Sequence, residues 1–548
     1  MTDPRFAAPW LDCDTSRVRP ARGQAVVATA NPEASWAAAL ILHQGGSAVD
    51  AAIAAQAVLT ACEANASGLG GGAIMLVAQG GQVSAIDGIA AAPARVTDRL
   101  GRDFDGRVIP ADRAEWGGRT VGVPGVVRAM ELAHRRWGRL PWAQLFAPAI
   151  ELAREGYRFS AYVRRSFLQD PHHLMEAMAR DLYRDAQGRL LPEGAVLRNP
   201  ALAQSLGEIA EGGADAFYHG RIAAEICRVV REDLFPGTLT ETDFARYRAV
   251  ERLPVRAAFG ANTLVGGCLP GFGGVAVAQI LGIAAALGLH GMGVEPDLEA
   301  IHILAEAGRL AFADRARYAG DPDHTQVDLQ SLVDPAYLAR QAARIDPGRA
   351  LREVKSDLAQ IEPLDSNTSH IAIADAQGCV VSMTTTINLY FGARLSACGF
   401  YLNNVMTNFA ANPKDGGKIS VNAMLPERRP RTSIAPCLLL DAACAPIVAV
   451  GAGGGGRIPG YVANALLRYA GGARDPQAIL GSPHALNHAG FTEIEPPLDA
   501  HAKALAQRGH LVFPRVLEGG TQMILRKGGT WLAGADPRRD GLGIGLAG

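Results

Sequence analysis

The chain has 548 residues and an almost even charge balance, with 53 Lys and Arg against 54 Asp and Glu. This balance gives no electrostatic reason to expect a nucleic acid or an anionic membrane as partner, and a small neutral or weakly anionic ligand fits better. The length suggests two to four domains, but no Pro/Ser-rich linker or charge block divides the chain.

The cysteines and the apolar segments exclude further classes of protein. Eight cysteines are scattered without a CxxC pair, which argues against a zinc site and against a disulfide scaffold. Residues 1–30 contain no apolar segment after a basic start, so we expect no secretory signal and a cytoplasmic protein. The longest apolar stretch, residues 274–294, contains Gln279, His290 and several glycines, which favours a buried helix over a membrane span.

Two helices are expected near the N-terminus. Asn31 followed by Pro32 is typical of an N-cap with proline at the first helical position, and it predicts a helix through Leu42. Residues 47–50 resemble a capping box and predict a second, Ala-rich helix to about Cys62. Both helices are apolar on more than one face, which predicts that they are packed inside a layer. Residues 67–77 then form a glycine turn that leads into a strand, without the Lys-Ser/Thr of a phosphate loop.

Helices dominate the expected elements before residue 340, and strands dominate them after Thr368. Residues 120–250 are mostly helical in pattern, and residues 307–319 predict another helix. In residues 369–375 and 379–387 small or polar residues alternate with β-branched ones around the turn-prone residues 376–378, which predicts a hairpin. We therefore expect an α+β fold in which helices cover the outer faces of sheets.

Thr368 stands at the head of the first strand of this hairpin. A threonine hydroxyl is a poor nucleophile without an adjacent base, and one solution makes the threonine an N-terminus so that its own α-amine takes the proton. That solution requires cleavage of the bond between Asn367 and Thr368. Taken alone, the tetrapeptide Asn367-Thr368-Ser369-His370 favours an ordinary threonine at a strand start.

Several motifs around Thr368 resemble those of one enzyme family. In chain order they are Thr368-Ser369-His370, Thr386-Ile387-Asn388 with Phe391-Gly392, Leu402-Asn403-Asn404-Val405-Met406, Arg431-Thr432-Ser433-Ile434-Ala435-Pro436 and Gly451-Ala452-Gly453-Gly454-Gly455-Gly456-Arg457. Together they resemble the gamma-glutamyltransferase family, N-terminal-nucleophile (Ntn) hydrolases whose proenzymes cleave themselves before a Thr in a Thr-Thr-His or Thr-Ser-His motif. The resemblance extends from Asn31 to Gly541.

The resemblance implies a fold, a cleavage site and a set of catalytic residues. The fold would be an αββα sandwich, in which residues 1–367 and 368–548 become two chains of one intertwined domain. Thr368 would be the nucleophile, Thr386 would bond it and assist processing, and the N–H groups of Gly454 and Gly455 would form the oxyanion hole. Without the resemblance, Thr386 could be a solvent-facing strand residue and the glycines a plain turn. We expect no metal or organic cofactor, and as partners a small-molecule amide and the two processed chains, which could pair further into a homodimer.

The expected substrate pocket departs from the family pattern. Asn388, Thr432 and Ser433 match pocket-lining positions, but Ile89 stands where gamma-glutamyl enzymes place an Arg for the α-carboxylate. Asn408 stands where they place an Asp for the α-amine, and an ammonium without its counter-ion loses on the order of a few kcal/mol in a partly buried pocket. Arg394 and Arg431 are candidates to bind a carboxylate from another direction, although either could be a surface charge.

Three functional hypotheses stay open at this point. The first is a self-cleaving amidohydrolase acting on a non-glutamyl substrate, with oxamate as first choice and cephalosporin or glutaryl amides as alternatives. The second is a glutathione hydrolase or gamma-glutamyltransferase that holds its amino acid with different residues. The third is a non-catalytic homologue, against which stands the joint presence of the catalytic residues named above.

Overall fold

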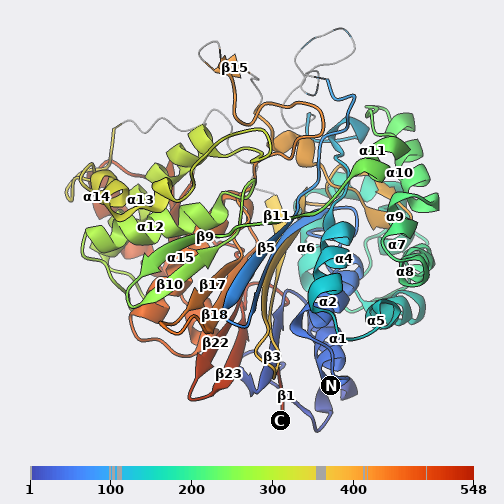
Figure 1. The fold of residues 1–548 in the computed structure, drawn as a ribbon, viewed down its shortest axis with the longest axis horizontal. Coiled ribbons are helices and arrows are strands. Elements are labelled where there is room, and N and C mark those ends of the chain that lie inside the picture. The colour runs from blue at the N-terminus through green and yellow to red at the C-terminus, as the bar shows by residue number, and fades with distance from the viewer. Residues whose placement is uncertain are drawn as a thin grey trace.

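The computed structural model describes residues 3–97, 100, 105, 107, 114–352, 366–410, 414–415, 418–488 and 490–547. Within these residues the main strands form two sheets, one of eight strands and one of seven. Helices cover the outer face of each sheet, which gives four layers in the order helix, sheet, sheet, helix (Figure 1). The predicted αββα sandwich is therefore confirmed.

The first sheet carries Thr368 on one of its central strands. Its order is β1 (Leu11–Cys13), β24 (Leu542–Leu546), β3 (Ala25–Thr29), β11 (Ser366–Ala374), β12 (Val380–Leu389), β4 (Gly72–Gln79), β5 (Gln82–Gly88) and β8 (Val250–Arg252). The hairpin of β11 and β12 lies between β3 and β4, so strands from both sides of the Asn367–Thr368 bond alternate in one sheet.

The second sheet packs against the first around a shared apolar core. Its order is β2 (Ala21–Gly23), β23 (Thr530–Ala535), β22 (Thr521–Lys527), β18 (Pro446–Ala452), β17 (Cys437–Leu440), β10 (Asn262–Gly266) and β9 (Val255–Phe259). The central strands β11 and β12 contact β18 across the sandwich. This contact brings the end of β18 and the loop that follows it close to Thr368.

Two groups of helices form the outer layers. On the first sheet lie α1 (Pro32–His43), α2 (Ala48–Cys62), α4 (Val126–Trp137) and α5 (Trp142–Glu155), extended by α6 (Ala161–Gln169), α7 (Ala177–Tyr183), α8 (Pro200–Gly212), α9 (Asp215–Tyr218), α10 (Arg221–Glu232) and α11 (Glu241–Arg246). On the second sheet lie α12 (Gly273–Ala286), α13 (Leu298–Tyr318), α14 (Pro335–Ala342) and α15 (Ile458–Ala470).

Smaller elements complete the described chain. The helix α16 (Pro476–Gly481) packs on β22 and β23, and α17 (Ala502–Gln507) packs on a small sheet of β19 (Ala485–Asn487), β20 (Phe491–Ile494) and β21 (Leu511–Pro514). Three short pairs are β6 (Tyr157–Arg158) with β7 (Val196–Leu197), β13 (Ser396–Ala397) with β14 (Phe400–Tyr401), and β15 (Lys414–Asp415) with β16 (Lys418–Ile419).

The helix-start signals near the N-terminus are confirmed. The Asn31 side chain accepts a hydrogen bond from the Glu33 N–H, and Ser47 and Asp50 form a reciprocal capping box. Every residue of α2 is buried, because the helix packs between α1, α5 and the first sheet. The Ala-rich composition thus allows close approach on all sides of the helix.

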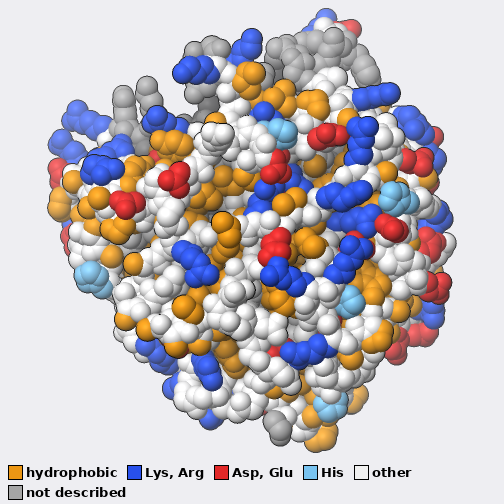
Figure 2. Space-filling model, viewed as in Figure 1, with side chains coloured by type: hydrophobic (Ala, Val, Ile, Leu, Met, Phe, Trp, Pro, Cys, Tyr) orange, Lys and Arg blue, Asp and Glu red, His pale blue; other side chains and the backbone are white. Residues whose placement is uncertain are grey.

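The remaining secondary-structure predictions are largely confirmed, with two corrections. The hairpin and the helices of residues 120–250 form as predicted, and the apolar stretch forms the buried helix α12. No helix among the described residues is long and apolar enough to cross a bilayer. The helix predicted from residue 307 begins earlier, at Leu298, and strands β8 to β10 interrupt the supposedly helical first part of the chain. Figure 2 shows basic and acidic side chains interspersed over the face in view, in keeping with the even charge balance.

Candidate active site

Thr368 lies where the ladder between β11 and β12 is irregular. Ser369 pairs with Thr385 and Asn367 with Asn388, so the register shifts between these pairs at Thr368. Such a bulge re-aims a side chain out of the regular ladder. Thr368 is only 3% exposed, and its hydroxyl is turned toward Thr386 on the neighbouring strand.

Two threonine hydroxyls converge on the carbonyl that precedes Thr368. The Thr368 hydroxyl lies 2.6 Å from the Asn367 carbonyl oxygen and 3.2 Å from the Thr386 hydroxyl. The Thr386 hydroxyl donates to the same carbonyl over 2.8 Å and accepts a hydrogen bond of 2.8 Å from the Asn388 N–H. One hydroxyl is thus beside the peptide bond, and a second, oriented hydroxyl can stabilise negative charge on its oxygen.

The Asn367 side chain holds the other side of this peptide bond. Its Oδ1 accepts from the Thr368 N–H at 2.8 Å and from the Tyr162 hydroxyl at 2.9 Å. The Tyr162 hydroxyl also lies 3.2 Å from that of Tyr390. Residues from α6 and from the turn after β12 therefore fix the orientation of the bond between Asn367 and Thr368.

His370, the third residue of the Thr-Ser-His motif, is not a suitable base for Thr368. Its Nδ1 lies 2.9 Å from the hydroxyl of Thr384 on the neighbouring strand β12, and its ring packs on Gly451 of β18 in the second sheet. Burial lowers the pKa of His370 to about 3, so the ring is neutral. His370 is therefore not available as a charged or proton-accepting partner of Thr368.

The glycine-rich loop after β18 runs directly beside Thr368. A Cβ built on Gly453 would lie 2.2 Å from the Thr368 carbonyl oxygen, so only glycine permits this approach. Gly454 and Gly455 adopt positive φ values of 115° and 57°, and Gly455 begins a short 3₁₀ helix (Gly455–Arg457) that packs on β11. The structure thus places the predicted oxyanion-hole glycines at the site and adds Gly453, which sequence reasoning had not singled out.

Asn388 organises the turn that carries Asn408. Its Nδ2 donates to Asn404 Oδ1 and to Thr407 Oγ1, both at 3.0 Å, and it adopts a positive φ of 84°. Asn408 ends the short helix Val405–Asn408 and is half-buried, and its carbonyl accepts from the Asn422 side chain at 2.8 Å. The hydrogen bonds of the Asn388 side chain therefore stabilise this turn.

Thr432 and Ser433 form a buried segment beside the start of α12. The Thr432 carbonyl accepts from the Phe272 N–H at 2.9 Å, and its N–H donates to the Pro270 carbonyl at 3.1 Å. The Ser433 hydroxyl is buried and has no hydrogen-bond partner among the described residues. A buried hydroxyl in this position can accept a polar group of a ligand at little desolvation cost.

Ile89 belongs to the apolar core between the sheets. Its side chain is 1% exposed, while its N–H donates to Asp87 Oδ1 and its carbonyl accepts from the Tyr247 hydroxyl. The neighbouring cations, Arg252 and Arg429, pair with the buried Asp87 carboxylate at 2.8 and 3.6 Å. They are therefore already neutralised by protein groups.

Arg394 and Arg431, the two candidate carboxylate-binding residues, both contact other groups of the protein. Arg394 donates to Asp170 Oδ2 at 2.6 Å, and its guanidinium lies 3.6 Å from the ring centroid of Trp116. Arg431 is buried, and its Nη1 lies 3.4 Å from the Ala316 carbonyl. A carboxylate ligand at Arg394 would have to compete with Asp170.

Glu63 and Arg539 surround the predicted nucleophile but were missed from the sequence. Glu63, just after α2, accepts a hydrogen bond from the Ser369 hydroxyl, and burial raises the pKa of Glu63 to about 8. Arg539, in the loop between β23 and β24, donates from Nη1 to the Thr368 carbonyl at 2.9 Å. Glu63 stands before the glycine turn that the sequence marks, whereas no local pattern marks Arg539.

Comparisons with known proteins show similarity over most of the chain. The family model described as gamma-glutamyltranspeptidase matches residues 34–546. The glutathione hydrolase proenzyme of Pseudomonas aeruginosa is 36% identical over 77% of this chain and 75% of its own length. The acylase ACY 1 proenzyme of Pseudomonas sp. (strain SE83) is 32% identical over 97% of this chain and 96% of its own length. The crystal structure of a cephalosporin acylase from Bacillus halodurans matches with a TM-score of 0.83 and 26% identity, over 96% of this chain and 97% of that one.

Proposed function

The chain belongs to the gamma-glutamyltranspeptidase family of Ntn hydrolases, which cleave amide bonds, and on that premise we propose that it is a precursor that cuts itself before Thr368. The mature enzyme would hydrolyse a small amide that carries a carboxylate but no α-amine, with oxamate as first choice. The observation that carries the proposal is the convergence of the Thr368 and Thr386 hydroxyls on the Asn367 carbonyl.

Self-cleavage begins with attack of the Thr368 hydroxyl oxygen on the Asn367 carbonyl carbon. The Thr386 hydroxyl donates to the developing oxyanion, which supports this step. The C–N bond then breaks, the Thr368 nitrogen keeps the electron pair and takes a proton, and an ester joins Asn367 to the threonine oxygen. Water hydrolyses the ester, which leaves an Asn367 carboxylate and a Thr368 with a free hydroxyl and a free α-amine.

Substrate hydrolysis repeats the same chemistry between two molecules. The α-amine takes the hydroxyl proton as the oxygen attacks the substrate amide, and the proton then goes to the leaving amine. The N–H groups of Gly454 and Gly455 are proposed to bind the oxyanion, and such a donor contributes roughly a hundred- to a thousand-fold in rate. Water then releases the acyl group as a carboxylic acid.

The residues at the two expected head-group positions argue against a glutamyl head group. Ile89 is buried in the apolar core, and Asn408 is neutral, so neither residue can pair with a charged group of the substrate. The unpartnered Ser433 hydroxyl remains to bind a polar group. A short substrate with one carboxylate requires fewer charged contacts than a glutamyl amide does, which favours oxamate or a similar small metabolite.

An acylase acting on a longer amide is the second candidate. The observation that favours it is the match to an acylase proenzyme over nearly the full length of both chains. The two candidates differ in the size of the acyl group, so a panel of oxamate, glutaryl-p-nitroanilide and gamma-glutamyl-p-nitroanilide separates them.

The test uses the purified protein after its intact mass has been recorded. Ammonia release from oxamate with a kcat/KM at least tenfold above that for either anilide supports the first choice. Preferred cleavage of the glutaryl amide supports the acylase, and preferred cleavage of the gamma-glutamyl amide overturns the substrate proposal while leaving the mechanism in place. A chain that stays uncut and inactive overturns both.

A further inference from the structure

We propose that Arg539 is a positioning residue that lowers the proton affinity of the Thr368 α-amine, so that the amine is a free base near neutral pH. The inference rests on the proposed function, because only cleavage before Thr368 creates this amine. It adds a group outside the motif residues to the machinery of the site.

The guanidinium of Arg539 is bonded to the nucleophile residue itself. It is buried, donates from Nη1 to the Thr368 carbonyl at 2.9 Å, and donates from Nη2 to the Glu518 carbonyl at 3.0 Å. The nitrogen and the carbonyl oxygen of one residue lie at most about 3.6 Å apart, so the cation is within about 6–7 Å of the future amine. Cleavage removes Asn367 but leaves the Thr368 carbonyl, so this contact does not depend on the intact bond.

Two glycines keep the space that Arg539 occupies. A Cβ on Gly453 would lie 2.6 Å from Arg539 Nη1, and a Cβ on Gly520 would lie 2.4 Å from its Cδ. The opposite face of the guanidinium is covered by the Tyr162 ring, whose centroid lies 4.5 Å from Cζ. Larger residues at these two glycine positions would therefore displace the Arg539 side chain from Thr368.

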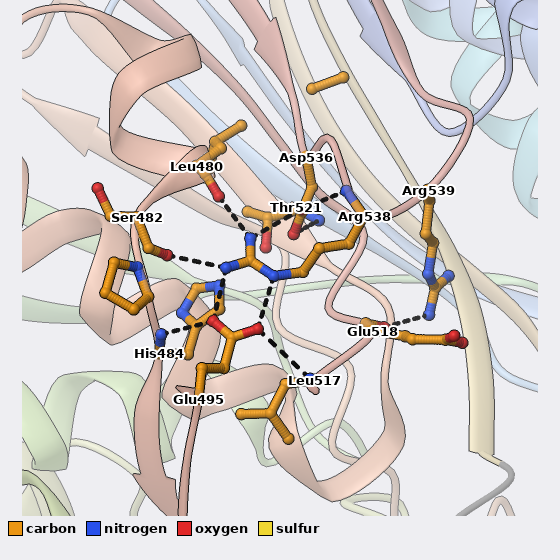
Figure 3. Close-up of polar contacts among 12 residues, drawn as sticks. Leu480, Ser482, His484, Glu495, Leu517, Glu518, Thr521, Asp536, Arg538 and Arg539 are labelled. Carbon is orange, nitrogen blue, oxygen red and sulfur yellow. Dashed lines mark hydrogen bonds and ion pairs between the residues drawn. The ribbon is translucent and has the colours of Figure 1, made fainter. Parts of the chain in front are cut away.

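The preceding residue, Arg538, anchors the loop. Its Nε and Nη2 donate to the two oxygens of Glu495 at 2.8 and 2.5 Å, and its Nη1 donates to Asp536 Oδ1 at 3.1 Å. It also donates to the carbonyls of Leu480 and Ser482. Figure 3 shows the two arginines at adjacent positions with their guanidinium groups pointing in different directions. One arginine thus fixes the backbone from which the other reaches the nucleophile.

The other titratable groups around Thr368 offset this charge only in part. Below its raised pKa of about 8, Glu63 is protonated and neutral. Burial raises the pKa of the Tyr162 hydroxyl well above its ordinary range. The Glu518 carboxylate pairs with Arg165 at 3.1 Å and lies 3.5 Å from the Tyr390 hydroxyl, and Asp540 accepts from the Tyr162 N–H at 3.1 Å.

The sign and the size of the effect follow from electrostatics. A nearby cation disfavours the ammonium form, so it lowers the pKa of the amine. At about 6 Å and an effective dielectric constant of about 20, the interaction amounts to about one to two pH units. From an ordinary value of about 7.7–8.0, the amine would titrate at about 6–7, which raises the free-base fraction at pH 7 from about one tenth to about half or more.

Competitive acetylation of the mature protein tests this directly. Trace acetic anhydride is applied between pH 5 and 10, and the peptide that begins at Thr368 is quantified by mass spectrometry, which needs no substrate. The wild-type amine should titrate at about 6–7, Arg539→Met should raise the apparent pKa by about one to two units, and Arg539→Lys should restore most of the difference. Arg154→Gln is the matched control, since Arg154 is exposed on the outer helix α5 and its removal should leave the pKa of the amine unchanged.

Each other result is decisive. Equal pKa values in wild type and Arg539→Met overturn the inference, whereas absence of any peptide beginning at Thr368 in the wild type overturns the proposed function instead. If Arg539→Met stalls at the ester, hydroxylamine cleaves the bond between the Asn367 acyl group and the threonine oxygen, and the α-amine that the acyl shift has already freed is then measured on the separated chain. Should that fail while Arg539→Lys matures, the charge acts in cleavage and not on the base, and the inference is again overturned.

Discussion

The Thr386 hydroxyl donates a 2.8 Å hydrogen bond to the carbonyl oxygen of Asn367, the residue before the proposed nucleophile. The strands that carry the two residues are paired, and the Asn388 N–H bonds the same hydroxyl from its other side at 2.8 Å. Thr386 is therefore oriented toward the bond whose cleavage we propose. A substitution that keeps the shape of its side chain but removes the hydroxyl can separate a role in self-cleavage from a role in folding.

Thr386→Val should slow self-cleavage by roughly a hundred-fold or more, because it removes one donor to the oxyanion while it keeps the shape of the side chain. The measurement is the fraction of cut chain over time, read by intact mass after denaturation. Thr386→Ser keeps the hydroxyl and should cut at a rate within about tenfold of wild type. Equal rates for the Val and Ser variants would show that Thr386 is only a strand residue.

Gly453→Ala should prevent maturation and lower the thermal midpoint. The added Cβ would lie 2.2 Å from the Thr368 carbonyl oxygen and 2.6 Å from Arg539 Nη1, so the loop or the strand must move. Gly207→Ala is the matched control, since Gly207 lies within α8 with nothing within 4 Å of a Cβ and alanine favours a helix. A Gly453→Ala chain that matures and melts like wild type would contradict the described packing.

Glu63 predicts a specific dependence of stability on pH. Its pKa is about 8 in the folded chain and about 4.3 in the unfolded one, so between these values the folded chain holds a proton that the unfolded chain releases. Its contribution to stability is therefore full below about pH 4.3 and is lost as the pH rises toward about 8, on the order of a few kcal/mol.

Glu63→Gln should remove this loss and flatten the dependence. The measurement is the difference between thermal midpoints at pH 5 and pH 8, in a Thr368→Ala background so that one uncut chain is compared. Replacement of the exposed Glu193 by Gln is the control and should leave the wild-type slope. Parallel curves for Glu63→Gln and its parent would show that Glu63 is not the titrating group.

Ile89→Arg should destabilise the protein by several kcal/mol and fail to create gamma-glutamyl activity, because it places a charge in the apolar core. Ile89→Met, which nearly conserves volume, should fold and mature normally. Thermal midpoints and hydrolysis of gamma-glutamyl-p-nitroanilide read both effects. A stable, active Ile89→Arg variant would mean that position 89 faces the pocket.

Local signals predicted those parts of the fold that depend on neighbouring residues. The caps at Asn31 and Ser47 and the alternation around residues 376–378 predicted α1, α2 and the hairpin of β11 and β12. The helix α15 was not predicted, although Pro459 stands in its first turn. The glycine run directly before it favours a loop and hides the start of the helix.

The site was predictable to the extent that it is carried by motifs. Thr368, Thr386 and the glycine loop come together as the resemblance implied, whereas Arg539 and Glu63 reach β11 from 171 and 306 residues away. Contacts at such separations depend on the packing of the two sheets and leave no periodic trace in the sequence. The burial of Ile89 likewise could not be seen from a motif position alone.

The measurement that tests the central claim most directly is the denatured intact mass of the purified protein after incubation at neutral pH. The proposal predicts two species, residues 1–367 and 368–548, and a single full-length species for Thr368→Ala. A wild-type chain that stays whole, or a Thr368→Ala chain that still divides at this bond, would contradict the assignment of Thr368 as the nucleophile.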